Sequence, residues 1–268
     1  MKLIATDLDG TLLGPDGELS ARTRAALKLA RQQDVRVVPA TARSLRGVRK
    51  LRDFDAFPDW IVGANGAFVA HLGSGELRHA AVLSPPVQGS VAAALLQLRP
   101  DACFASVRDW GAIIVAEPRY RALTSFADHL RSPDEFVLAS LDEVLAVGGH
   151  KLAARGESWD AFEVATDLRA LDVPRCSVTA SGQPMVEIAA EGVSKARGLA
   201  RLCADLGVDA ADVVAFGDTL NDVEMLQWAG TAIAVGNASE AVKQVADRVT
   251  ADNAEDGVAQ VLEDLLRS

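Results

Sequence analysis

The sequence LIATDLDGT, residues 3–11, decides the fold of this protein. Residues 3–6 have the composition of a buried β-strand, yet the chain runs directly from them into two carboxylates, Asp7 and Asp9, and then into Gly10. Asp and Gly are common in turns, so the charge alone could mark a helix cap or a solvated turn. Two acids behind a buried strand also suit a metal site, and the rest of the chain has to decide between these readings.

Short apolar runs alternate with amphipathic helical stretches at both ends of the chain, which predicts an α/β fold with a Rossmann-like parallel sheet and crossover helices. The expected N-terminal elements are a strand at 3–6, a helix at 20–33, a strand at 35–41, a helix at 44–52 and a strand at 60–63. The expected C-terminal elements are a helix at 194–206, a strand at 213–216, a helix at 222–229, a strand at 231–235 and helices from 239 and from about 255.

The middle of the chain follows a different pattern. Candidate strands at 103–107, 112–116, 151–154 and 176–179 lie among candidate helices at 89–98 and 159–171. Proline and glycine cluster at both borders of this block, in LSPP from Leu83 and in SGQP from Ser181. We therefore expect a core domain formed by 1–83 and 184–268, with an inserted α+β domain at 84–183.

Polar residues follow the expected core strands at the point where each strand ends. They are Asp7 and Asp9, then Thr41 and Arg43, then Asn65 and Gly66, and finally Asp218, Asn221 and Asp222. Ligands of open parallel sheets bind beyond the carboxyl ends of the strands. Any one polar turn is ordinary, but four together predict a single site at this edge of the sheet.

The composition excludes several classes of function. The chain has 268 residues, of which 49% are hydrophobic, and a formal net charge of −10, so we expect a globular protein that binds neither nucleic acid nor an anionic membrane. The three cysteines lack CxxC spacing, which argues against a zinc site or a disulfide framework. No apolar stretch approaches a membrane span, and the run after Lys2 is too short for a signal peptide, so a cytoplasmic location is expected. The oligomeric state cannot be read from the sequence.

Four motifs, taken in order, resemble those of the haloacid dehalogenase-like phosphatases. They are DLDGT at 7–11, Thr41 after an apolar strand, Lys195 in GVSKARGL, and GDTLND at 217–222. The tail at 232–266 resembles the Cof-type branch, whose members carry a C2 (IIB) cap between the second and third motifs. The resemblance covers both core segments and the position of the cap, and it implies the HAD-like fold.

The residues themselves suit phosphoryl transfer. A phosphate ester is anionic, so an attacking carboxylate needs a divalent cation beside it, and Mg2+ prefers oxygen ligands. Asp7 would attack phosphorus and form an aspartyl phosphate, while Asp9 would protonate the leaving oxygen and then deprotonate the hydrolytic water. The resemblance adds that the backbone carbonyl of Asp9 joins Asp7 and Asp218 around the metal.

The remaining motif residues have positioning roles. Thr41 would hydrogen-bond a phosphoryl oxygen, and Lys195 would place a positive charge against Asp7 and the phosphate. Asn221 is expected to bind phosphate, and Asp222 to support the metal shell or to orient Lys195.

Arg43 is a candidate substrate contact because it directly follows Thr41 and Ala42. The other cations of its basic run, Arg46, Arg49, Lys50 and Arg52, are expected on a solvated face. The sequence departs from the family pattern at Ala42, where Gly is usual, and the change would affect how closely a substrate approaches that loop.

The sequence therefore predicts a Mg2+-dependent phosphatase of small phosphorylated metabolites, such as sugar phosphates, with a cap that closes over the site. One alternative is a phosphomutase of the phosphomannomutase type, which returns the phosphoryl group to a sugar instead of to water. A second alternative is a non-catalytic module that binds phosphorylated ligands.

Overall fold

The computed structural model describes residues 1–48 and 60–267, which form two compact units. The first unit comprises Met1–Ala42, Val48–His79 and Ser194–Ser268, and the second comprises Arg43–Gly47 and Ala80–Val193. The insertion expected at 84–183 lies within the second unit, but that unit extends to Val193. The reason is that strand β11 (Val186–Ala190), which the sequence placed in the core, pairs with two strands of the second unit.

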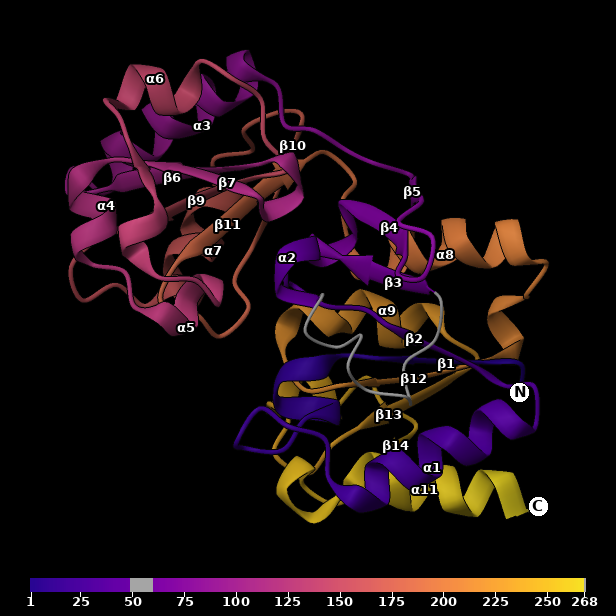
Figure 1. The fold of residues 1–268 in the computed structure, drawn as a ribbon. Coiled ribbons are helices and arrows are strands. Elements are labelled where there is room, and N and C mark those ends of the chain that lie inside the picture. Colours follow the sequence, from indigo (N-terminus) through magenta and orange to yellow (C-terminus); the bar gives the residue numbers. More distant parts are fainter. Residues whose placement is uncertain (49–59, 268) are drawn as a thin grey trace. The chain divides into compact units, whose positions relative to one another are not determined.

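The first unit contains the expected parallel sheet, which confirms the α/β fold class. Its strand order is β14-β13-β12-β1-β2, formed by β1 (Leu3–Thr6), β2 (Arg36–Pro39), β12 (Val213–Gly217), β13 (Thr231–Ala234) and β14 (Arg248–Val249). Figure 1 shows α1 (Ala21–Gln32) and α11 (Gly257–Arg267) on one face, with α8 (Lys195–Leu206) and α9 (Val223–Trp228) on the other. Strand β1 is fully buried because helices cover both faces of the sheet. A short helix, α10 (Glu240–Lys243), follows β13.

Side chains and glycine fix the ends of the core helices where the sequence indicates them. The Ser20 side chain accepts a hydrogen bond from the Thr23 N–H at the start of α1, and Ser194 accepts one from the Arg197 N–H at the start of α8. Helix α8 ends at Gly207, whose left-handed conformation carries no Cβ penalty. The position of Lys195 as the first residue of α8 is thus defined locally.

The third expected strand does not continue the parallel sheet. Strand β3 (Trp60–Gly63) begins a separate antiparallel meander with β4 (Phe68–His71) and β5 (Leu77–Arg78), and a single parallel bridge between Ala40 and Val62 joins it to the β2 side. Asn65 and Gly66 both have positive φ and turn the chain back at once. Helix α2 covers only Leu45–Val48, and the expected continuation to residue 52, with Arg49, Lys50 and Arg52, lies outside the described residues.

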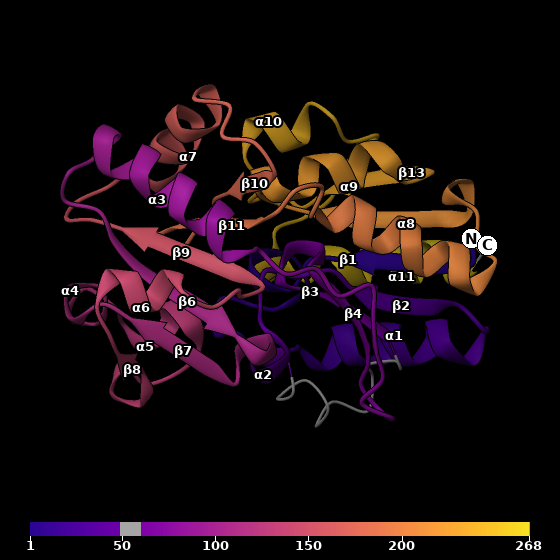
Figure 2. The ribbon, with the colours of Figure 1, turned by 90° about the horizontal axis from the view of Figure 1, so that it is seen from above.

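The second unit is built on a six-stranded sheet with the order β10-β11-β9-β6-β7-β8. Its other strands are β6 (Cys103–Arg108), β7 (Ile113–Ala116), β8 (Val137–Leu138), β9 (Lys151–Arg155) and β10 (Cys176–Thr179). Its helices are α3 (Pro85–Leu98), α4 (Pro118–Ala122), α5 (Phe126–His129), α6 (Leu141–Leu145) and α7 (Ala161–Ala170). Helices α3 and α7, neighbours in Figure 2, cover one apolar face with α6. The opposite face carries two buried ion pairs, Lys151 with Glu187 and Arg155 with Asp128.

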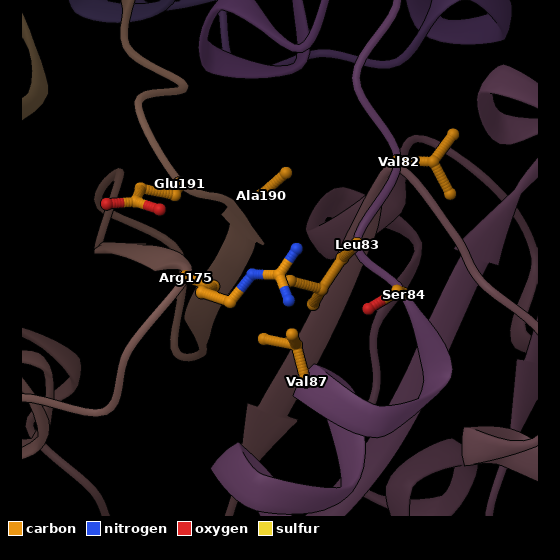
Figure 3. Close-up of a pocket in the computed structure, with 7 residues that line it drawn as sticks. All are labelled: Val82, Leu83, Ser84, Val87, Arg175, Ala190 and Glu191. Carbon is orange, nitrogen blue, oxygen red and sulfur yellow. The ribbon is translucent and has the colours of Figure 1, made fainter.

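A pocket of about 230 Å³ lies within the second unit, between the N-terminus of α3 and the end of β11. Figure 3 shows the Arg175 guanidinium beside Leu83 and above Val87, whereas the carboxylate of Glu191 points away from it. All seven lining residues belong to the second unit, while the phosphatase-like motifs, apart from Arg43, belong to the first.

Acidification is expected to destabilise the second unit. His150 is buried and stacks on Trp110 with ring centroids 5.4 Å apart, and burial together with the charge of Lys151 lowers its pKa to about 3. Between its usual pKa near 6.5 and this value, the unfolded chain binds a proton that the folded unit does not, so the free energy of unfolding falls by about 1.4 kcal/mol per pH unit. Urea unfolding should show a loss of about 2 kcal/mol from this group between pH 6.5 and 5. His150→Phe should lose correspondingly less, and equal losses in both proteins would contradict the assignment.

Candidate active site

The turn after β1 is shaped by a glycine that cannot be replaced by a larger residue without strain. The Leu13 N–H donates to the Leu8 carbonyl at 2.9 Å and closes the turn, and Asp9 (φ −77°, ψ 118°) with Gly10 (φ 81°, ψ −6°) forms a type II bend inside it. A Cβ on Gly10 would lie 2.5 Å from Oδ2 of Asp218. Gly10 therefore supplies both the positive φ and the space that the neighbouring carboxylate occupies.

Three buried carboxylates meet at the carboxyl ends of β1 and β12. Oxygen atoms of Asp7, Asp218 and Asp222 all lie within 4.8 Å of one another. The two strands are parallel neighbours, and the Asp7 N–H extends their ladder by donating to the Phe216 carbonyl at 3.0 Å. The structure thus brings together residues that are more than 200 positions apart in the sequence, as expected for strand ends that share one edge of a sheet.

Lys195 lies between two of these carboxylates. Its Nζ is 2.9 Å from Oδ1 of Asp7 and 2.7 Å from Oδ1 of Asp222, and the residue is 1% exposed. Burial disfavours the charged amine, but the two carboxylates outweigh it and raise the pKa of Lys195. The amine is therefore a fixed positive charge at neutral pH.

Two glycines set the depth of Lys195, and sequence reasoning assigned them no such role. A Cβ on Gly66 would lie 2.0 Å from the Ser194 carbonyl oxygen, and a Cβ on Gly198 would lie 2.5 Å from Val62 and 3.1 Å from the Cα of Gly66. Helix α8 consequently packs backbone to backbone against the turn after β3. In the sequence, the only indication of this close packing was Gly198, which lies one helical turn after Lys195.

Asp222 organises its loop as well as the lysine. Its Oδ1 accepts from Lys195, while its Oδ2 accepts from the N–H groups of Asp218 and Thr219, each at 3.1 Å. Asp218 in turn accepts a 2.7 Å hydrogen bond at Oδ1 from the hydroxyl of Thr11. Because both oxygens of Asp222 already have donors, its contacts favour the role of orienting Lys195 over that of a direct metal ligand.

The electrostatics of the cluster fit a divalent cation. Burial raises the pKa of Asp7 well above its usual range. The negative charges of Asp222 and Asp218 raise this pKa further, and the positive charge of Lys195 offsets the two effects only in part. Burial and the charge of Asp222 raise the pKa of Asp218 to about 6. Three carboxylates thus face one amine, which leaves excess negative charge among hard oxygen donors. Mg2+ is a cation suited to such a donor set.

Three other predicted site residues, Asn221, Thr41 and Asp9, differ in their contacts and burial. Asn221 donates from Nδ2 to Oδ1 of Asn65 at 3.1 Å and accepts from the Thr219 hydroxyl, so its amide ties two loops together, and its phosphate contact stays a prediction. Thr41 is fully buried and its N–H donates to the Val62 carbonyl at 2.9 Å. Asp9 is exposed on the turn beside Asp7.

Arg43 and Ala42 lie on either side of a boundary between the units. Ala42 ends the first segment of the core unit, whereas Arg43 begins the short segment that groups with the second unit. The proposed substrate contacts of both residues therefore stay predictions.

A family model described as haloacid dehalogenase-like hydrolase matches residues 4–262. The chain belongs to this family. Among its relatives are Phosphatase YwpJ of Bacillus subtilis, 29% identical over 99% of this chain and 100% of that protein, and the HMP-PP phosphatase of Cronobacter sakazakii, 30% identical over 88% of this chain and 85% of that protein. The haloacid dehalogenase-like membership that the motifs suggested is confirmed, and the chain is an enzyme of the phosphatase type.

Solved structures support the same assignment. A haloacid dehalogenase-like hydrolase from Bacteroides thetaiotaomicron has a TM-score of 0.78 and 29% identity, covering 98% of this chain and 99% of that one. The subclass IIB sugar phosphatase BT4131 has a TM-score of 0.81 at 21% identity, covering 99% of both chains, a likeness that shows the fold alone. Among the described residues, no helix has the length and apolar character that crossing a bilayer requires.

Proposed function

We propose that this haloacid dehalogenase-like enzyme hydrolyses small phosphorylated metabolites, such as sugar phosphates or similar phosphomonoesters, in a Mg2+-dependent reaction through an aspartyl phosphate on Asp7. The observation that carries the proposal is the buried group of Asp7, Asp218 and Lys195, in which an acid at the end of β1 is held against an amine and a second acid. The activities for which two relatives are named agree with a small substrate: one is an HMP-PP phosphatase and another a 5-amino-6-(5-phospho-D-ribitylamino)uracil phosphatase.

In the first step, a carboxylate oxygen of Asp7 forms a bond to phosphorus while the bond from phosphorus to the ester oxygen breaks. Asp9 gives its proton to that departing oxygen. Lys195 holds Asp7 in place through Oδ1, which leaves Oδ2 for the attack. A bound Mg2+, held by Asp7, Asp218 and the Asp9 carbonyl, would neutralise charge between the attacking carboxylate and the phosphoryl group.

In the second step, the Asp9 carboxylate takes a proton from water, and the water oxygen forms a bond to phosphorus. The bond between phosphorus and Asp7 breaks, inorganic phosphate leaves, and Asp9 is again protonated for the next turnover. Thr41 and the N–H groups of the turn after β1 would hold phosphoryl oxygens in both steps, which is the positioning that a loose transition state requires.

A screen of phosphorylated metabolites tests this function. Release of inorganic phosphate is measured with Mg2+ and with a chelator, and the Asp7→Asn protein serves as the blank for contaminating phosphatases. The proposal is supported if the unaltered protein releases phosphate in a Mg2+-dependent manner and the Asp7→Asn protein does not. It is refuted if the unaltered protein releases phosphate from none of the phosphomonoesters. Release without a bisphosphate activator distinguishes hydrolysis from the phosphomutase alternative.

Replacing Asp9 with Ala should separate the two steps. With p-nitrophenyl phosphate the leaving group needs little protonation, so Asp7 is still phosphorylated, but the water lacks its base, and turnover should fall by about 10²- to 10⁴-fold. Rapid quenching and intact-mass measurement should detect the phosphorylated protein accumulating. Normal turnover without accumulation would remove Asp9 from the acid and base role.

A further inference from the structure

Two asparagines from the C-terminal segment hold the turn that carries Asp9. Asn237 donates from Nδ2 to the Gly10 carbonyl at 2.8 Å, and Asn253 donates from Nδ2 to the Leu13 carbonyl at 2.8 Å. The asparagines are also joined, because Oδ1 of Asn237 accepts the Asn253 N–H at 2.9 Å. We call these two joined residues the Asn237–Asn253 clamp, which holds the turn at Gly10, within its bend, and at Leu13, directly after it.

The clamp is itself anchored close to the carboxylates. Asn237 follows β13, and two residues later the Ser239 N–H donates to the backbone carbonyl of Asp218 at 3.0 Å. Before it, the Gly236 N–H donates to the Ala251 carbonyl at 3.1 Å, and a Cβ on Gly236 would lie 2.1 Å from Oδ1 of Asp252. The segment from Gly236 to Ser239 therefore connects the turn after β1 with the loop that begins at Asp218. Hydrogen bonds hold this segment at both of its ends.

The turn needs external support because its bend contains a glycine. Glycine has more accessible backbone conformations than other residues, so the peptide after Gly10 can rotate unless its carbonyl is held. That rotation would move the neighbouring Asp9, whose side chain is exposed and is not one of the three clustered acids. The hydrogen bond at the Gly10 carbonyl opposes it directly.

We propose that Asn237 and Asn253 are positioning residues of the phosphatase reaction, which fix the turn at Leu8–Leu12 so that Asp9 faces the leaving oxygen. The inference rests on the proposed function. Neither residue needs to touch the substrate; each acts through a backbone carbonyl of the turn.

The leaving group distinguishes this role from a merely structural one. The kcat/KM value reports the steps up to formation of the aspartyl phosphate, in which Asp9 acts as an acid. A misplaced acid slows a substrate with a poor alkoxide leaving group and leaves p-nitrophenyl phosphate nearly unaffected. We expect Asn237→Ala and Asn253→Ala to lower kcat/KM by about tenfold or more for an alkyl phosphate, and by a smaller factor for p-nitrophenyl phosphate. The N–H groups of the turn hold phosphoryl oxygens of both substrates, whereas the acid of Asp9 is needed mainly by the alkyl phosphate.

Asn237→Asp and Gln33→Ala provide matched comparisons. Asn237→Asp keeps the shape of the side chain but replaces the donor with a carboxylate oxygen, so it should be at least as impaired as Asn237→Ala. Gln33 also donates a side-chain amide to a backbone carbonyl, that of Leu266 at 3.0 Å, and it lies just before β2, at the edge of the sheet opposite the carboxylates. Gln33→Ala should leave the ratio of the two kcat/KM values unchanged.

Amide hydrogen exchange at Leu13 provides a readout that does not depend on activity. Its N–H closes the turn on Leu8, so exchange should be about tenfold faster in Asn237→Ala and Asn253→Ala and unchanged in Gln33→Ala. Equal losses for the two substrates, or unchanged exchange at Leu13, would overturn the clamp. Absence of hydrolysis in the unaltered protein would refute the proposed function instead, and exchange would still decide whether the clamp holds the turn.

Discussion

Asp7→Asn is expected to abolish phosphatase turnover, with a loss on the order of 10⁴-fold or more, while the fold stays intact. The amide is nearly the same size as the carboxylate but is a far weaker nucleophile, and it cannot carry the phosphoryl group between the two steps. Initial rates with the best substrate of the metabolite screen, measured at saturating Mg2+, give the loss. Residual activity within tenfold of the unaltered protein would refute the assignment of the nucleophile.

The same variant should not be destabilised in the absence of metal, and this separates a catalytic loss from a folding defect. Asp7 is buried beside two other acids, and its raised pKa shows that its ionised form is disfavoured there. A neutral amide removes that repulsion, while Lys195 keeps Asp222 as a partner at 2.7 Å. Thermal unfolding in a chelator should therefore give a Tm equal to or above that of the unaltered protein.

Lys195→Met is expected to lower both activity and stability. The variant keeps a long apolar side chain but leaves Asp7 and Asp222 without their shared counter-charge, and breaking a buried ion pair typically costs about 3 to 5 kcal/mol. Turnover should fall by about 10²- to 10³-fold because a preorganised charge beside the phosphoryl group is lost. Urea unfolding in a chelator and steady-state rates with Mg2+ measure the two losses.

A second substitution tests whether charge is the cause of the lost stability. Adding Asp7→Asn to Lys195→Met removes one of the two uncompensated acids, so the double variant should recover part of the free energy of unfolding. The loss in the single variant should also shrink as the pH is lowered from 8 to 5, because Asp7 and Asp218, whose pKa values are raised by burial, take up protons. A loss that neither change reduces would point to packing instead of charge.

The convergence of the acids was predictable because the geometry of parallel sheets dictates it. Asp7 and Asp218 follow strands that run the same way, and the order of the motifs indicated Lys195. The hydrogen bonds of Asn237 and Asn253 were not predictable, since their acceptors are backbone carbonyls, which leave no trace in the choice of residue. The meander after β3 was missed because Asn65 was interpreted as a site residue, and its role in reversing the chain direction was not considered.

The boundary of the second unit was predicted only in part, for a related reason. Strand β11 directly precedes the lysine motif, so proximity in sequence suggested that it belonged to the core. Its ladder with β9 joins residues more than 30 positions apart, which local composition does not reveal. Its ladder with β10 is a hairpin across the SGQP stretch, which was interpreted as a domain border. The pattern of Pro and Gly indicated a domain border near Gln183, but the change of unit comes at Val193.

The contact between Gly66 and Gly198 has a consequence for how variants of this enzyme should be interpreted. Neither glycine has a reactive group, yet any side chain at Gly198 would wedge α8 away from the sheet and withdraw the amine from both acids. In a survey of random mutants, substitutions at these two glycines would therefore abolish activity as substitutions of catalytic residues do, although the glycines only leave room for the backbones to meet.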